Sequence, residues 1–84
     1  MSTDLDELLD DVRLDAALEA LLLVVDAPTE DEAFALALGQ PVARVRAALQ
    51  RLAVGYTEQE RGIDLRNIGG GWRFYTRDVY APHV

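Results

Sequence analysis

Hydrophobic residues recur at helical spacing in the first half of the chain, beginning at Leu14. The first stripe is made of Leu14, Leu18, Leu21, Leu22 and Val25. Asp15 and Glu19 fall on the opposite side, so this stretch is predicted to form the first helix of the fold. The helix should end within DAPT, residues 26–29, because Pro28 lacks the amide donor that a continuing helix needs.

A second helix is predicted to begin at the segment TEDE, residues 29–32. In this capping-box pattern the Thr29 hydroxyl accepts a hydrogen bond from the amide of Glu32, and the Glu32 side chain reaches back to the amide of Thr29. The residues expected to face inward are Phe34, Ala37 and Leu38. Gly39 is expected to end the helix, because glycine readily takes the left-handed terminal conformation.

A third helix is predicted directly afterwards, with Pro41 in its first turn. Its apolar stripe is formed by Val42, Val45, Leu49 and Leu52. Its flanks carry Arg44 and Arg51 on one side and Arg46 and Gln50 on the other, and its outward positions are assigned to Ala43, Ala47, Ala48 and Ala53. Two helices joined by a very short turn that contains glycine are typical of a helix-turn-helix.

Apolar and polar residues alternate with a period of two across residues 61–77, which predicts two strands. The apolar members are Ile63, Leu65, Trp72 and Phe74. The glycines at 69–71 supply the positive φ that a two-residue hairpin turn demands. Ile68 breaks the alternation and indicates either a bulge or a contact on the second face of the hairpin. Trp72 is expected to pack in the core.

Two registers of this hairpin are compatible with the sequence. A turn at positions 69–70 sets Leu65 opposite Phe74 and Arg66 opposite Arg73, and the second pair brings two like charges together. A turn at positions 70–71 relieves this repulsion by pairing Asp64 with Arg77, and it keeps the same apolar faces. The sequence leaves the choice open.

Three helices followed by a hairpin predict an α+β fold, a winged helix-turn-helix with a three-helix bundle and a C-terminal β-hairpin wing. We assign residues 14–84 to this domain. Residues 1–13 form an acidic N-terminal extension whose Leu5, Leu8, Leu9 and Val12 are helically spaced, and we expect a weak helix or a disordered tail. The residues given structural roles are Thr29, Glu32, Gly39, Pro41, Gly70, Gly71, Trp72 and Phe74.

Charge divides the chain into two unequal parts. Residues 1–32 hold eleven acidic residues against one arginine, a net charge of −10, whereas residues 33–84 hold seven arginines against four acidic residues, a net charge of +3. All eight basic residues are arginine, which pairs with carboxylate and phosphate in planar, bidentate geometry. A defined acidic protein partner therefore suits this set as well as DNA does.

Candidate catalytic chemistry is sparse in this sequence. There is no cysteine, and the single histidine, His83, cannot build a histidine-based metal centre by itself. The glycines at 69–71 join two strands rather than a strand and a helix, so they do not predict a phosphate-binding loop. The longest apolar run, residues 20–25, is far too short to span a bilayer. We expect a cytoplasmic protein that is not an enzyme, with no cofactor and no membrane partner.

Three stretches of the chain resemble the N-terminal domain of the ScpB family, the bacterial segregation and condensation protein B. They are LEALLLVVDAPT, RGIDLRNIGGGWRFYTR and VYAPHV, and the resemblance runs from about Leu14 to Val84. An R-G-I-x-L sequence, a Gly-Gly turn, an aromatic residue, T-R and Y-A-P follow one another in the order and spacing of that family.

The resemblance implies a non-catalytic subunit of a bacterial condensin-like complex with an SMC ATPase and the kleisin ScpA, acting in chromosome condensation and segregation. It implies two tandem winged-helix domains, of which residues 14–84 would be the N-terminal one and the second is absent from this chain. It also implies a homodimer and a nucleoid-associated location in the cytoplasm. The full-length protein would contact the kleisin and the ATPase.

The candidate contact residues differ between two hypotheses. As a protein-assembly module, the chain would use the polar face of the wing, namely Arg66, Arg73, Tyr75 and Arg77, and would self-associate through aliphatic and alanine-rich parts of its helices. Tyr75 is equally compatible with an exposed side chain that has no role. As a DNA-binding regulator, the third helix would enter the major groove and offer Arg44, Arg46, Gln50 and Arg51. The net charge of −7 opposes that alternative, so only weak or indirect DNA contact is expected.

Overall fold

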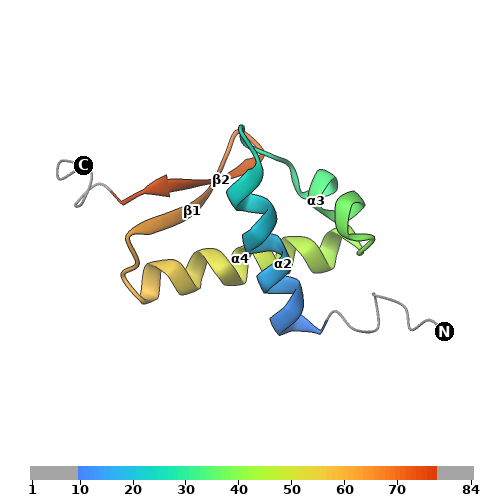
Figure 1. Cartoon of the computed structure of the whole chain (residues 1–84), viewed down its shortest axis with the longest axis horizontal. Helices are drawn as coiled ribbons and strands as arrows, with labels where there is room; N and C mark the ends of the chain where they lie inside the picture. Colours follow the sequence, from blue (N-terminus) through green and yellow to red (C-terminus); the bar gives the residue numbers. More distant parts are fainter. Residues whose placement is uncertain (1–9, 78–84) are drawn as a thin grey trace.

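The computed structural model describes residues 10–77 and has the predicted α+β winged-helix architecture (Figure 1). The elements are α2 (Asp11–Val24), α3 (Asp31–Leu38), α4 (Val42–Glu58), β1 (Ile63–Ile68) and β2 (Gly71–Thr76). The two strands form one antiparallel hairpin. Predictions that concern residues 1–9 and the motif Tyr80-Ala81-Pro82 lie outside the described residues.

The first described helix, α2, begins three residues before the predicted start at Leu14. Asp10 is its N-cap, and the Asp10 carboxylate accepts a hydrogen bond of 2.9 Å from the amide of Arg13. A carboxylate at this position satisfies an amide that has no partner within the helix, which explains the early start. The boundary drawn between residues 13 and 14 therefore falls inside a continuous helix.

The capping box predicted at Thr29 and Glu32 is wrong. The N-cap of α3 is Glu30, and no side-chain hydrogen bond caps the helix. Thr29 instead forms a β-bridge with Trp72, in which the amide of each residue donates to the carbonyl of the other at 3.0 and 2.8 Å. Because the Thr29 amide is used in this pairing, it is not open to Glu32, and the Thr29 hydroxyl donates to the carbonyl of Ala27.

The ends of α3 and α4 follow the sequence more closely. Gly39 has a left-handed backbone with φ of 64°, as predicted for the terminus of α3. Pro41 is the N-cap of α4 and lies one residue before its first turn.

On α3 one inward position was predicted wrongly. Ala37 is exposed, and Ala35 is buried in its place beside Phe34. Ala35 and Ala37 fall on opposite flanks of the stripe formed by Phe34 and Leu38, and the core lies on the Ala35 flank.

The outward assignment of Ala48 is also wrong, because this residue is fully buried. Ala53 is partly buried against the core, whereas Ala43 and Ala47 are exposed as predicted. The small side chain of Ala48 lies on the side of α4 that packs against neighbouring elements, so the apolar stripe of α4 is wider than the four residues identified from the spacing.

The hairpin adopts the first of the two predicted registers. Leu65 lies opposite Phe74 and Arg66 opposite Arg73, and the turn residues Gly69 and Gly70 have φ of 63° and 86°. Positive φ at both central residues is the requirement of a type I′ turn, which matches the twist of the flanking strands. The ladder runs without a bulge up to Ile68, whose side chain is half exposed.

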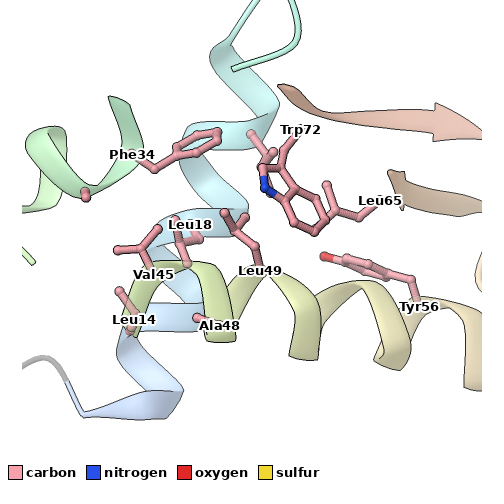
Figure 2. Close-up of a cluster of buried hydrophobic side chains, with 11 residues drawn as sticks. Leu14, Leu18, Phe34, Val45, Ala48, Leu49, Tyr56, Leu65 and Trp72 are labelled. Atoms are coloured by element: carbon pink, nitrogen blue, oxygen red, sulfur yellow. The ribbon is translucent and has the colours of Figure 1, made fainter. Parts of the chain in front are cut away.

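The core lies where the three helices meet the hairpin (Figure 2). Its largest fully buried side chains are Phe34, Leu14, Leu18, Leu49 and Val45. Trp72 reaches from β2 into this cluster and is only 6% exposed, as expected from the sequence. Phe74 meets Tyr56 edge to face, with ring centroids 5.6 Å apart. The hairpin is therefore an integral part of the core.

Candidate protein-interaction surfaces

The arginines of α4 are bonded to acidic residues of the N-terminal half. Arg51 binds the two carboxylate oxygens of Asp15 through Nη2 at 2.5 Å and Nε at 3.2 Å. Arg46 Nε donates to Asp31 Oδ2 at 2.7 Å, and Arg44 Nη2 lies 3.4 Å from Asp11 Oδ1. Part of the positive charge of the C-terminal half is therefore neutralised by acidic residues of the N-terminal half within the fold. Three of the four candidate DNA-contact side chains are bonded in this way.

Asp31 connects three elements and was not identified as an important residue from the sequence. Its Oδ1 accepts a hydrogen bond of 2.5 Å from the indole Nε1 of Trp72, while its Oδ2 binds Arg46. The hydrogen bond and negative charge of Asp31 raise the pKa of Arg46 above its ordinary value. Trp72 lies 41 positions further along the chain. No local pattern signals such a contact, because a carboxylate in the first turn of a helix is already favoured by the helix dipole.

A hollow of about 300 Å³ lies between α2 and α4. Its polar lining is bonded internally, since the Tyr56 hydroxyl donates to Glu19 and Arg51 binds Asp15. Burial, followed by the hydrogen bond to Glu19, raises the pKa of Tyr56 well above its ordinary value, so the phenol stays neutral at physiological pH. This arrangement supports packing between the helices and does not resemble an acid–base pair poised for catalysis.

The outer face of the wing carries the candidate contact residues Arg66, Arg73 and Tyr75. The guanidinium carbons of Arg66 and Arg73 lie 5.3 and 5.9 Å from the centroid of the Tyr75 ring. Both cations are thus within range of one aromatic ring, and this attraction offsets the repulsion that the register predicts. Arg66 also lies 3.7 Å from Asp64. Both arginines are exposed, so their guanidinium groups remain accessible to a partner.

Arg77, the fourth candidate contact residue, is held within the chain. Its Nε donates to the carbonyl of Arg61 at 2.5 Å, its Nη2 donates to the carbonyl of Tyr56 at 3.0 Å, and the same Nη2 lies 2.8 Å from Asp64. The Tyr56 carbonyl belongs to the last turns of α4, where helix carbonyls need partners from outside the helix. Arg77 therefore fastens the end of β2 to the end of α4.

A second apolar face of α2 is directed to solvent. Val12, Leu23 and Val24 are 77, 72 and 70% exposed, and Ala16 and Ala20 between them are also exposed. Because Leu14, Leu18 and Leu22 of the same helix are buried, α2 is apolar on both sides. Exposed aliphatic side chains that gather on one surface often mark an interface, so this face of α2 is a candidate interface.

The described residues hold no group of acidic or histidine side chains arranged to bind a metal ion. Within the same residues, no helix has the length and apolar character needed to cross a membrane. The candidate interaction surfaces among the described residues are the outer face of α2, the outer face of the wing, and an apolar groove between α4 and β1 that includes Val54 and Leu65.

Comparison with protein families identifies the chain. The model of the family described as segregation and condensation complex subunit ScpB matches residues 16–84. The chain belongs to the ScpB family. The resemblance expected from the three sequence stretches is confirmed, and so is the fold, since the crystal structure of ScpB from Mycobacterium tuberculosis superimposes with a TM-score of 0.87 at 51% identity.

Two further relatives bear on function. Segregation and condensation protein B of Moorella thermoacetica is 34% identical over 70 residues, which cover 83% of this chain and 36% of that protein. A dimer of an ScpB N-terminal domain complexed with an ScpA peptide matches with a TM-score of 0.76 at 28% identity, over 82% of this chain and 86% of that one. The match to the Mycobacterium protein covers 89% of this chain and 47% of that one. This ScpB-family chain thus spans about half or less of its longer relatives.

Proposed function

We propose that this ScpB-family chain is a non-catalytic assembly and dimerisation module of a bacterial condensin-like complex, in which an SMC ATPase and a ScpA-like kleisin are its partners. In that role it acts in chromosome condensation and segregation, at the nucleoid in the cytoplasm. The full-length protein would make the contacts with the kleisin and the ATPase. Family membership and the relative solved as a dimer with an ScpA peptide support this assignment.

The observation that carries the proposal is that the arginines of α4 are paired with carboxylates of the same chain. A DNA-binding winged-helix protein would place this helix in the major groove. Its arginines Arg44, Arg46 and Arg51 contact Asp11, Asp31 and Asp15 of the same chain. Turning them to DNA would break those contacts and leave the acids facing a phosphate backbone. Two of its outward positions are alanines, Ala43 and Ala47, which donate no hydrogen bond to a base edge. The DNA-binding alternative is therefore not favoured.

Self-association would use the exposed face of α2. The small residues Ala16 and Ala20 lie at its centre, with Val12 near one end and Leu23 and Val24 at the other. A two-fold axis through the centre places α2 antiparallel to its copy, so that Val12 of one protomer meets Leu23 and Val24 of its partner. The central alanines would let the two helices approach closely.

The substitution Leu23→Glu tests this dimer. A carboxylate at a site that is 72% exposed should not unfold the monomer, but it should weaken dimerisation by about tenfold or more, because two charges would be buried across the axis. Sedimentation velocity over a concentration series measures the change. The matched control is Leu36→Glu on α3, whose side chain is 85% exposed and which should leave the dimer intact. Equal dimerisation in both variants would contradict the assigned face.

A further inference from the structure

The free edge of β1 offers a row of backbone groups without partners among the described residues. The Arg77 amide donates to the Gly62 carbonyl at 2.9 Å, so these two residues form a hydrogen-bonded pair just beyond the ladder. Hydrogen-bonded and non-hydrogen-bonded pairs alternate along antiparallel strands. It follows that the amides and carbonyls of Ile63, Leu65 and Asn67 point away from β2.

The other edge of the hairpin confirms this alternation. Trp72 lies opposite Asn67, and its amide and carbonyl also point away from the ladder, where they bind Thr29. Thr29 is thus a one-residue third strand on the β2 side. On the β1 side, no such backbone partner exists within residues 10–77. Open strand edges of this kind bind extended segments of other chains.

An apolar groove accompanies the open edge. It has a volume of about 390 Å³ and is lined by Ala53, Val54, Thr57, Glu58 and Leu65. The groove therefore lies between the C-terminal half of α4 and β1, which run beside each other (Figure 1). Val54 in its wall is 54% exposed, although most aliphatic residues of α4 are buried or partly buried.

We propose that the edge of β1 takes up an extended peptide segment of a partner chain as an added strand. Side chains of a strand alternate between two faces, so every second residue of the peptide would be aliphatic and lie in the groove beside Val54. The intervening residues would lie on the outer face of the wing beside Arg66, which favours an acidic residue there. This inference rests on the proposed assembly function and adds the binding mode and the chemistry of the segment.

Two occupants compete for this edge. The N-terminal residues of this chain, with Asp4, Leu5 and Asp6, also alternate between acidic and aliphatic side chains. A segment of the kleisin is the better candidate, because a domain of similar extent in a relative was crystallised with an ScpA peptide. Deletion of residues 1–9 distinguishes the two, since peptide binding should persist without them. If these residues themselves protect the β1 edge amides, the deletion would expose those amides and overturn the proposal.

The test uses overlapping synthetic peptides that cover the ScpA-like kleisin of the same organism. Each is titrated into the 84-residue chain labelled with ¹⁵N, and amide hydrogen exchange is followed by NMR. In the complex, the amides of Ile63, Leu65 and Asn67 should become protected. The variant Asn67→Pro removes one outward amide without breaking a bond to β2, and it should weaken peptide binding by about tenfold. Asn67→Ala keeps the amide and should bind within about twofold of the wild type.

A second pair of variants tests the groove. Val54→Lys should weaken binding by about tenfold, because it places a charge where an aliphatic side chain is expected to lie. Gln50→Lys adds the same charge one turn away, outside the groove lining, and should have little effect. If full-length kleisin binds but neither Asn67→Pro nor Val54→Lys weakens it, the strand-addition mode is wrong and the assembly function stands. If full-length kleisin binds neither the 84-residue chain nor the full-length protein, the assembly function fails.

Discussion

The arginines of α4 and those of the wing are the same residue type in two opposite situations. On α4, Arg46 and Arg51 hold carboxylates of α3 and α2, so their charges act within the fold. On the wing, Arg66 and Arg73 share the ring of Tyr75, and Arg66 lies near Asp64 of its own strand, so their contacts stay within the hairpin. The arginines of residues 33–84 thus fall into two groups: those of α4 join helices to one another, and those of the wing lie on its outer face. Counting basic residues along a sequence cannot distinguish these two roles.

The wing can present its arginines only if it is fixed to the helices, and Gly71 is the tightest point of that attachment. A Cβ atom at Gly71 would lie 2.5 Å from Cβ of Pro28 and 2.9 Å from its carbonyl carbon. Pro28 lies in the segment between α2 and α3, and the next residue, Thr29, is paired with Trp72 of β2. Pro28 therefore cannot move freely away from Gly71.

Gly71→Ala should therefore destabilise the fold by about 3 kcal/mol, the largest effect that we expect, because the added methyl group forces the link and the strand apart. Urea unfolding followed by tryptophan fluorescence measures it, since Trp72 is the next residue. Gly62→Ala is the matched control, because its added Cβ meets no atom within 4 Å. A Gly71→Ala variant as stable as this control would show that the wing is not held at Pro28.

Asp31 of α3 also fastens the wing, through its hydrogen bond to Trp72. Asp31→Ala leaves the buried indole Nε1 of Trp72 without its acceptor, and the expected loss of unfolding free energy is about 2 kcal/mol. Asp31→Asn keeps an amide oxygen for the indole and should recover about half of this loss. Thermal unfolding of the three proteins gives the comparison. Equal stability of the Ala and Asn variants would mean that the bond to Trp72 contributes little.

The contacts of Trp72 with Thr29 and Asp31 mark the limit of prediction from the sequence. Spacing alone predicted the three helices, the hairpin and the inward position of Trp72, because each depends on neighbours within a few residues. The bridge between Thr29 and Trp72 and the bond between Asp31 and Trp72 depend on three-dimensional packing. The capping-box motif at Thr29 was a sound local pattern, but strand pairing with a distant residue took the amide that it required.

The candidate site was predicted only in part for the same reason. Arg66, Arg73 and Tyr75 were placed correctly on one face by period-two alternation. In the sequence, the repulsion between Arg66 and Arg73 was an argument against the register that the structure has. The Tyr75 ring offsets this repulsion, but its proximity to both guanidinium groups can be seen only in the folded hairpin. The outer face of α2 was expected only in general terms, as aliphatic and alanine-rich parts of the helices, and the folded structure shows which of its residues are exposed.

The smallest expected effects on stability come from the arginines themselves, and they test the comparison most directly. Arg51→Ala removes a bidentate but partly exposed ion pair with Asp15, so it should cost about 0.5–1 kcal/mol of unfolding free energy. Arg73→Ala should change stability by less than about 0.5 kcal/mol, because it removes an exposed cation whose proximity to Tyr75 is partly offset by relief of the repulsion from Arg66. Chemical unfolding of both variants checks these values.

Partner binding should follow the opposite order. In a pull-down with the ScpA-like kleisin, the full-length protein carrying Arg66→Ala, Arg73→Ala and Tyr75→Ala together should lose most of the captured kleisin, while Arg51→Ala should retain it. The triple variant removes both guanidinium groups and the ring from the outer face of the wing, whereas Arg51 is already bonded to Asp15. If Arg51→Ala lost the kleisin and the triple variant kept it, the α4 flank would be the contact surface, and the division between inward and outward arginines would have to be reversed.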